Sequence, residues 1–352
     1  MMNPVFKPVI NTRKIWLILL LAMLGAKAGI AQGTDSTDIR DLWVRSMLEK
    51  VSIEVSIDSD VESFKVGTGE DRRVFKPNLG SNLRFHFRYR FISAGVQWAP
   101  HFLPGNRVDD IKGTSKSLRL RAALQLVHFN AELIYNRIRG YYLENTGDVD
   151  PSWTEGDPLY QFPNQNYAGF RLKAIYNTNA NFSFRSITDQ AERQVRSAGS
   201  FTPGLVLRHY IVDDRATPVG SQRSVNIEAS IGPGYHYTFV FGKEYFFTLG
   251  AMASVGYLHT NLLTRFAEGD WKTDQNNFII RGEGIAGIGY NGDKFYTGIF
   301  YTLSASEFSQ QHNTVINDNV RSVFRFFIGF RFPPPRFLRR TTDKVKEIIP
   351  VL

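Results

Sequence analysis

Aromatic and cationic side chains alternate along this chain with a period of two residues. Successive side chains of a β-strand point to opposite faces, so the aromatics share one surface and the cations the other. Residues 83–91 read LRFHFRYRF, and residues 324–332 read FRFFIGFRF. Similar alternation recurs at residues 118–126, 170–174 and 225–231. The pattern predicts amphipathic strands along most of the chain.

Two all-β architectures present one apolar and one polar face, the soluble sandwich and the membrane barrel. Here the polar face is repeatedly arginine, and the apolar face is rich in Phe, Tyr and Leu. A closed barrel leaves no open sheet edge in lipid. We therefore predict an all-β fold, an antiparallel transmembrane up-and-down β-barrel. A soluble periplasmic β-sandwich that acts as a binding module is the alternative.

The spacing of the alternating segments predicts about twelve strands, an even number. We expect them at residues 51–57, 79–91, 93–99, 116–126, 129–138, 168–177, 199–212, 224–236, 244–258, 276–290, 294–305 and 319–332. Odd-numbered connections are long (58–78, 100–115, 139–167, 213–223, 259–275 and 306–318), and most even ones are short. Long outer loops and short periplasmic turns are typical of outer-membrane barrels, with both termini in the periplasm.

The N-terminus has the layout of a secretory signal peptide: basic residues, a short apolar run and then small residues. Cleavage after Ala28 or after Ala31 fits equally well. The chain then divides into a signal peptide (1–31), a periplasmic N-terminal segment (32–50), an outer-membrane β-barrel (51–332) and a basic periplasmic tail (333–352).

Composition excludes several classes of site. Without cysteine, the chain has no disulfide scaffold, no Cys-ligated metal and no Cys nucleophile. No apolar window is long enough for a membrane-spanning helix. The formal charge of +9 comes mostly from the signal peptide and the tail, so it does not indicate nucleic-acid binding. We expect no cofactor and no metal. Expected partners are outer-membrane lipid, lipopolysaccharide and the barrel-assembly machinery.

The charged residues of the polar face would point into the lumen. They are Arg84, Arg88, Arg90, Arg119, Arg121, Arg171, Lys173, Glu132, Glu228, Arg281, Glu283 and Arg325. Cross-strand ion pairs among them could fill a plugged lumen, which is the favoured interpretation. The other is a cation-lined path that favours anions, with Arg84 and Arg119 as its lining.

Residues 178–198 depart from the pattern, because they form a polar connection of about twenty residues where a short periplasmic turn is expected. The favoured interpretation is a solvated periplasmic excursion, in which Ser186 caps a short helix. The alternative is a plug folded under or into the lumen.

Several short motifs in this order resemble a bacterial family catalogued as domain of unknown function 4421. They are Lys76-Pro77-Asn78, Lys112-Gly113-Thr114-Ser115, Arg139-Gly140-Tyr141-Tyr142-Leu143, Asn181-Phe182-Ser183-Phe184, Gln194 and Ser197-Ala198-Gly199-Ser200. The resemblance implies an exported, outer-membrane, β-rich protein, and it supplies no catalytic residues.

An enzymatic barrel is the remaining alternative, a hydrolase of lipid or peptide with a site at the outer rim near His209, Asp213 and His259. No nucleophile motif and no zinc helix accompany these histidines, so we assign no catalytic residue. The acidic loop 139–167 lacks the spacing of a calcium loop. The basic tail is either disordered or a binder of anionic headgroups or peptidoglycan.

The sequence thus predicts a non-enzymatic protein of the outer membrane of a Gram-negative bacterium, a structural or narrow transport element with an arginine-rich lumen. It does not identify a small-molecule ligand.

Overall fold

A computed structural model describes residues 39–66, 72–106, 109–214, 221–309 and 319–348. The chain divides into two compact units, residues 1–40 and 41–352, and the second unit carries the fold. The predicted signal peptide, with its cleavage points after Ala28 or Ala31, lies outside the described residues. Within the described residues, no helix has the length and apolarity needed to cross a membrane.

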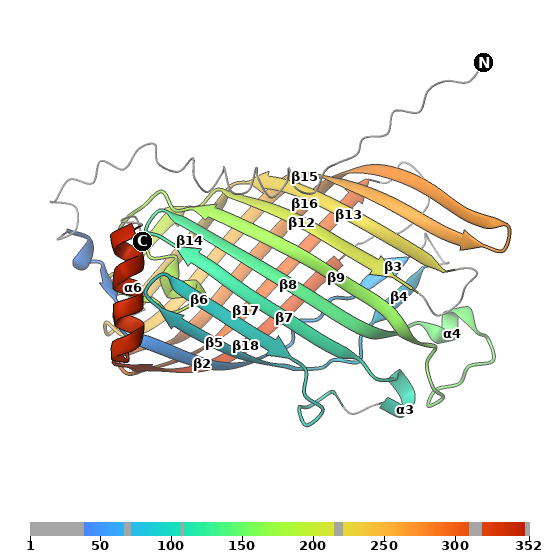
Figure 1. Ribbon diagram of the computed structural model, residues 1–352, viewed down its shortest axis with the longest axis horizontal. Coiled ribbons are helices and arrows are strands. Elements are labelled where there is room, and N and C mark those ends of the chain that lie inside the picture. Colours follow the sequence, from blue (N-terminus) through green and yellow to red (C-terminus); the bar gives the residue numbers. More distant parts are fainter. Residues whose placement is uncertain (1–38, 67–71, 107–108, 215–220, 310–318, 349–352) are drawn as a thin grey trace, which may run out of the picture. The chain divides into compact units, whose positions relative to one another are not determined.

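Twelve antiparallel strands form a closed ring in sequence order (Figure 1), which confirms the predicted fold class and strand number. The ring contains β2 (Val51–Asp58), β5 (Asn82–Tyr89), β6 (Ile92–Trp98), β7 (Lys116–Gln125), β8 (Phe129–Leu143), β9 (Gln161–Tyr176), β12 (Gly204–Asp213), β13 (Gln222–Gly232), β15 (Tyr245–Phe266), β16 (Gly269–Asn291), β17 (Phe295–Ser309) and β18 (Asn319–Phe332). The pairing of β18 with β2, from Phe332 opposite Val51 to Arg325 opposite Asp58, closes the ring.

The residues that face outward are those that the alternation in the sequence predicts. On β5, Phe85 is 41 % exposed, whereas Arg88 on the lumen side is 1 % exposed. Phe324, Phe326 and Phe330 on β18 face outward in the same way. A continuous apolar outer surface of this extent is stable in hydrocarbon and not in water. The fold is therefore a transmembrane β-barrel, and the alternative of a soluble sandwich is wrong because the phenylalanines are not packed between two sheets.

Two predicted strands are each interrupted by a proline. The segment expected at 199–212 consists of β11 (Ala198–Phe201) and β12, with Pro203 between them. The segment expected at 224–236 consists of β13 and β14 (Gly234–Phe241), with Pro233 between them. Proline cannot donate a ladder hydrogen bond, so the strands break there. Because β13 and β14 both pair with β15, each interrupted segment still crosses the wall once.

Several of the long connections contain hairpins or short helices, which the sequence did not predict. The expected loop 259–275 is instead a hairpin, because β15 continues to Phe266 and β16 begins at Gly269. The connection 58–78 contains the hairpin of β3 (Phe64–Val66) and β4 (Arg73–Lys76). The short helices α3 (Asp109–Lys112) and α4 (Thr146–Val149) lie in two other long connections. We call the end with these connections the long-loop end and the opposite one the short-turn end.

The C-terminal segment forms helix α6 (Arg336–Ile348) at the short-turn end (Figure 1). The expectation of a disordered tail is therefore wrong for these residues. Thr342 faces the barrel, and Arg90 Nη1 donates a hydrogen bond to its Oγ1 at 3.0 Å. Arg90 also pairs with Glu49 and Asp343. These contacts attach α6 to the turn between β5 and β6.

Gly140 marks a β-bulge in β8, where the register with β9 shifts between Arg139 and Tyr141. Its φ is 89°, and an added Cβ would lie 2.3 Å from the Thr114 carbonyl oxygen. We expect Gly140→Ala to lower the free energy of unfolding by about 1–3 kcal/mol. Gly282→Ala is the control, because nothing lies within 4 Å of a Cβ there. Urea titration followed by gel migration would measure both, and equal midpoints would contradict the prediction.

Candidate functional site

Residues 178–198 fold into the lumen at the short-turn end, so the expectation of a solvated excursion is wrong. The segment contains α5 (Arg185–Thr188) and β10 (Glu192–Gln194), and β10 pairs with β1 (Val44–Ser46) from the N-terminal segment. Phe182 and Ala191 are fully buried. We call residues 178–198 the floor segment.

An aromatic cluster fixes the floor segment to the inside of the wall. Phe182, Phe184 and Ile187 of the floor segment are buried in this cluster. The wall contributes Ile175, Phe246, Tyr296, Phe300 and Phe327. These wall residues come from β9, β15, β17 and β18, so the floor segment packs against strands around much of the ring.

Asp189 of the floor segment is held by two wall side chains. Its carboxylate forms an ion pair with Arg121 at 2.8 Å and accepts a hydrogen bond from Ser93 Oγ at 2.7 Å. Burial alone would raise the pKa of Asp189, but the Arg121 guanidinium and the Ser93 hydroxyl hold that pKa below its usual range. The group is therefore an anion in the closed barrel.

Gln190, the next residue, is held through its carbonyl oxygen. Arg88 donates to this oxygen at 3.3 Å and Arg331 at 2.5 Å. Gln190 has a φ of 54°, a left-handed conformation that non-glycine residues seldom adopt. We call the contacts of Asp189 and Gln190 the latch. It joins the floor segment to β5, β6, β7 and β18.

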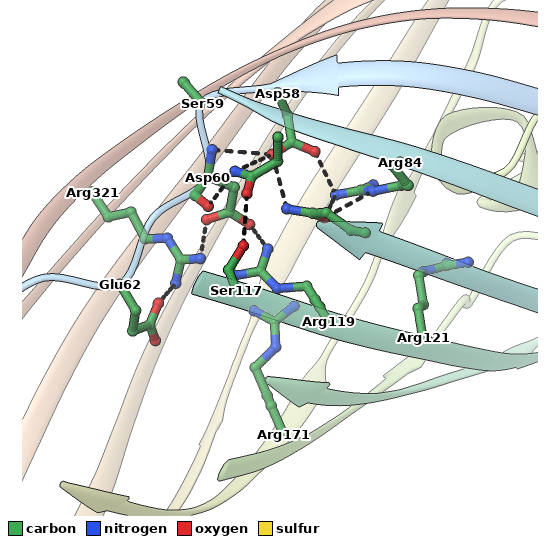
Figure 2. Close-up of polar contacts among 12 residues, drawn as sticks. Asp58, Ser59, Asp60, Glu62, Arg84, Ser117, Arg119, Arg121, Arg171 and Arg321 are labelled. Atoms are coloured by element: carbon green, nitrogen blue, oxygen red, sulfur yellow. Dashed lines mark hydrogen bonds and ion pairs between the residues drawn. The ribbon is translucent and has the colours of Figure 1, made fainter. Parts of the chain in front are cut away.

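The segment after β2, which we call the roof, places the carboxylates of Asp60 and Glu62 against arginines of the wall (Figure 2). The Asp60 carboxylate pairs with both Arg119 and Arg321. The Glu62 carboxylate pairs with Arg321 at 2.5 Å and with Arg208 at 3.0 Å. Three strands, β7, β12 and β18, are thereby tied to one short segment.

A second apolar cluster lies at the roof. Phe64 and Phe75, from the hairpin of β3 and β4, stack with their ring centroids 5.1 Å apart. They pack with Tyr141, Tyr167 and Tyr210 from the wall. An apolar cluster thus lies at each end of the lumen.

Between floor and roof lies a chamber of about 280 Å³. Asp60 and Arg321 line it at the roof, and Phe184, Ile187 and Thr188 line it at the floor. A smaller cavity of about 50 Å³ continues beside Arg208 and Arg281. The chamber wall carries cations on β5, β7, β9 and β18, whereas β15, β16 and β17 contribute Met252, Ile285 and Phe300 together with the polar Glu283, Thr302 and Ser304.

The structure places most of the predicted lumen residues at this chamber. Arg84, Arg119, Arg121, Glu132, Arg171, Lys173, Glu283 and Arg325 line it. Glu228 and Arg281 are paired with each other at 2.7 Å inside the barrel, and Arg88 lies beside the floor segment. The assignment of Arg90 to the lumen is wrong, because the strand ends at Tyr89 and Arg90 turns toward α6.

Sequence reasoning missed the carboxylates that neutralise these arginines. Asp58 pairs with Arg84 at 3.0 Å, and Asp60 and Glu62 form the roof. The signal was present, because Glu54, Asp58, Asp60 and Glu62 continue one alternating row through and past β2. Asp189 had no such signal, since it lies in an irregular polar segment.

The residues of the hydrolase alternative are not gathered into a site. His209 and His259 both lie opposite Ile227 on its two neighbouring strands, so one strand separates them. Asp213 pairs instead with Arg265 at 3.1 Å. His259 Nδ1 is 2.8 Å from the Asn276 side-chain oxygen, and its Nε2 is 3.9 Å from Asp274. Among the described residues, no cluster of three acidic or histidine side chains could hold a metal.

The short motifs noted in the sequence form hydrogen bonds near the roof and within the floor segment. Asn78 Nδ2 donates to the Gly113 carbonyl at 2.8 Å, and Ser115 Oγ donates to the Gly140 carbonyl at 2.8 Å. At the floor, Gln194 Nε2 donates to the Asn181 carbonyl at 2.7 Å. The residues that carry the resemblance therefore hold the roof and the floor in place.

Comparison with known proteins gives one family match and several distant structural matches. A family model described as a domain of unknown function (DUF4421) matches residues 39–332. The β domain of the Bordetella autotransporter BrkA is 10 % identical at a TM-score of 0.37, with 80 % of this chain and 100 % of that chain covered. LpxR from Salmonella typhimurium is 10 % identical at 0.32, with 80 % and 100 % covered. The outer membrane protease OmpT from Escherichia coli is 8 % identical at 0.30, with 81 % and 97 % covered. No curated protein matches.

Proposed function

The chain belongs to the family described as domain of unknown function DUF4421, and for this member we propose an exported outer-membrane barrel that is closed at rest. Its apolar outer face would contact outer-membrane lipid and lipopolysaccharide, and the barrel-assembly machinery would insert it. The short-turn end would face the periplasm, because short turns lie on that side of such barrels, and both termini would then be periplasmic.

One observation carries the proposal of closure, the packing of the floor segment against the inside of the wall. Its aromatic cluster and the latch together contact strands around much of the ring. A side-chain-filled lumen is typical of a structural barrel or of one that opens only when a segment moves. We propose that the role is non-enzymatic and is either structural or a narrow, gated path.

If the floor segment is released, the path would favour anions. The chamber wall beneath the roof carries Arg84, Arg121 and Arg171, and Asp189 leaves with the floor segment. A ring of cationic side chains attracts anions and repels cations at short range. The proposed substrates of an open path are therefore small anions.

Electrical recording in a planar bilayer tests the closed state. We expect no steady conductance from the folded wild-type protein at moderate voltage, because the floor segment fills the lumen at the short-turn end. A porin measured in the same bilayer is the positive control. A stable open level in the wild type would show that the proposed closure is wrong.

Fractionation tests the location. We expect the mature chain in the outer-membrane fraction. On a gel, the unboiled chain should migrate differently from the boiled chain. Its N-terminus should begin after Ala28 or Ala31. Recovery in the aqueous periplasmic extract would contradict the proposed location.

A further inference from the structure

Arg325 differs from the other arginines of the chamber in its partners. Arg84 pairs with Asp58 at 3.0 Å, and Arg121 pairs with Asp189 at 2.8 Å. Arg325 lines the chamber, and its guanidinium lies over the rings of Phe300 and Phe327, 5.2 and 5.5 Å from their centroids. The guanidinium forms no hydrogen bond or ion pair with any other residue in the described part of the chain, although the backbone of Arg325 pairs with β17 and β2.

A guanidinium has five N–H donors and keeps its charge in a protein. The charges that act most strongly on Arg325 are Glu54, which attracts it, and Arg84 and Arg121, which repel it. Glu54 is not within ion-pair distance of it. An enclosed cation with unused donors and cationic neighbours favours an anion as its partner, since a charge left unpaired away from water is costly.

The other side of the chamber is partly apolar, since apolar side chains lie there beside Thr302, Ser304 and Glu283, whose carboxylate pairs with Lys173. Ile187 of the floor segment and Met252, Ile285 and Phe300 of the wall line it. At about 280 Å³ the chamber is slightly smaller than the cavities of about 300–1,000 Å³ that hold drug-sized ligands. A fully hydrated inorganic ion would leave this apolar surface against water, whereas an organic ion with an apolar body would cover it.

We propose that the chamber binds a small amphipathic oxyanion, with its carboxylate or phosphate monoester group on Arg325 and its apolar body against the floor and β15 to β17. The guanidinium can bind either group with two parallel hydrogen bonds. The rings of Phe300 and Phe327 attract the guanidinium through cation–π contacts and so help to hold it beside the chamber. The inference goes beyond the proposed function, because a ligand enclosed during folding needs no opening of the floor.

Fluorine NMR of the protein refolded in the presence of each compound tests this. The compounds are 4-fluorobenzoate, 4-fluorophenyl phosphate, 4-fluorobenzyl alcohol and, as an unlabelled competitor, inorganic phosphate. Their presence throughout refolding removes any barrier to entry, and empty detergent micelles give the blank. We expect a broadened or shifted signal for one or both oxyanions, which also distinguishes carboxylate from phosphate, and none for the alcohol.

Three variants complete the test. Arg325→Gln should weaken binding by about tenfold to a hundredfold, the usual contribution of hydrogen bonds to a charged group. Arg325→Lys keeps the positive charge, so it should fold if only the charge at this position is needed for folding. Its ammonium lacks the planar fork of donors of a guanidinium, so binding should still fall. Arg137→Gln is the matched control, because Arg137 lies exposed on β8 outside the chamber.

Unboiled gel migration would confirm that each variant is folded. Equal binding by wild type and Arg325→Gln would overturn the proposal, as would no binding of either oxyanion by the wild type. If Arg325→Gln does not fold, equal binding by wild type and Arg325→Lys would overturn it. Binding of the alcohol as strong as that of the oxyanions, or full displacement by inorganic phosphate at equal concentration, would also overturn it.

Discussion

Asp189→Ala should turn the closed barrel into a conducting one. The substitution removes the anion that Arg121 and Ser93 hold, and it leaves the Arg121 guanidinium with Glu132 as its remaining ion-pair partner. Loss of one partner of a buried ion pair costs about 3–5 kcal/mol. The cost acts on the docking of the floor segment, because the wall strands keep their own hydrogen bonds.

A cost of that size shifts the equilibrium between docked and released floor by roughly a hundredfold to a few thousandfold. We therefore expect intermittent openings in a planar bilayer where the wild type has none. The reversal potential in a salt gradient should show a preference for anions. Arg331→Gln should act in the same direction, because it removes one of the two donors to the Gln190 carbonyl.

The matched control is Asp110→Ala. Asp110 is an exposed carboxylate at the long-loop end and belongs to neither closure. It should stay as silent as the wild type. Silent recordings from folded Asp189→Ala and Arg331→Gln barrels would reject a gated path and leave the structural role. Openings that prefer cations would reject the role of the chamber arginines.

The wall of this barrel was predictable because its signal is local. Whether Phe85 faces lipid and Arg84 faces the lumen follows from their positions on one strand, since neighbouring side chains must point in opposite directions. The number of strands follows from counting such segments. The proline breaks at Pro203 and Pro233 were readable in principle, because proline cannot continue a ladder.

The two closures were not predictable in this way because their burial depends on distant partners. The floor segment is polar, and Arg185 or Glu192 would each be exposed in isolation. In the fold they pair with each other at 2.7 Å under an aromatic cluster. Phe182 and Phe184, in an otherwise polar connection, were the local sign that one face of it is buried. Arg325 was predicted to face the lumen, but that its guanidinium has no ion-pair partner among the described residues could be seen only once the carboxylates of the lumen were placed.

Asp60→Ala should destabilise the barrel more than any change at an exposed ion pair. Asp60 is the shared partner of Arg119 and Arg321, so its loss leaves Arg119 without an ion pair and Arg321 with Glu62 alone. We expect the free energy of unfolding to fall by about 3–5 kcal/mol. Urea titration with unboiled gel migration would measure it, and Asp60→Asn should lose most of the same free energy.

The same roof should make stability depend on pH in the acid range. Burial raises the pKa of Asp60 and of Glu62, but Arg119, Arg321 and Arg208 more than offset this, so both pKa values lie below those of the unfolded chain. A carboxylate with a depressed folded pKa stabilises the fold fully above its unfolded pKa, about 4. That contribution falls as the pH drops below about 4, because the unfolded state then binds protons that the folded state does not.

Glu144→Ala is the control for both measurements. Glu144 pairs with Lys76 at the same end of the barrel, but both side chains are more than two-fifths exposed. Exposed pairs contribute about 0–1 kcal/mol, so this variant should unfold near the wild-type urea midpoint and keep the wild-type acid dependence. Asp60→Ala should instead show a flatter acid dependence, because it lacks one of the groups whose pKa is depressed. Equal midpoints for the two variants would mean that the roof segment is not clamped by its arginines.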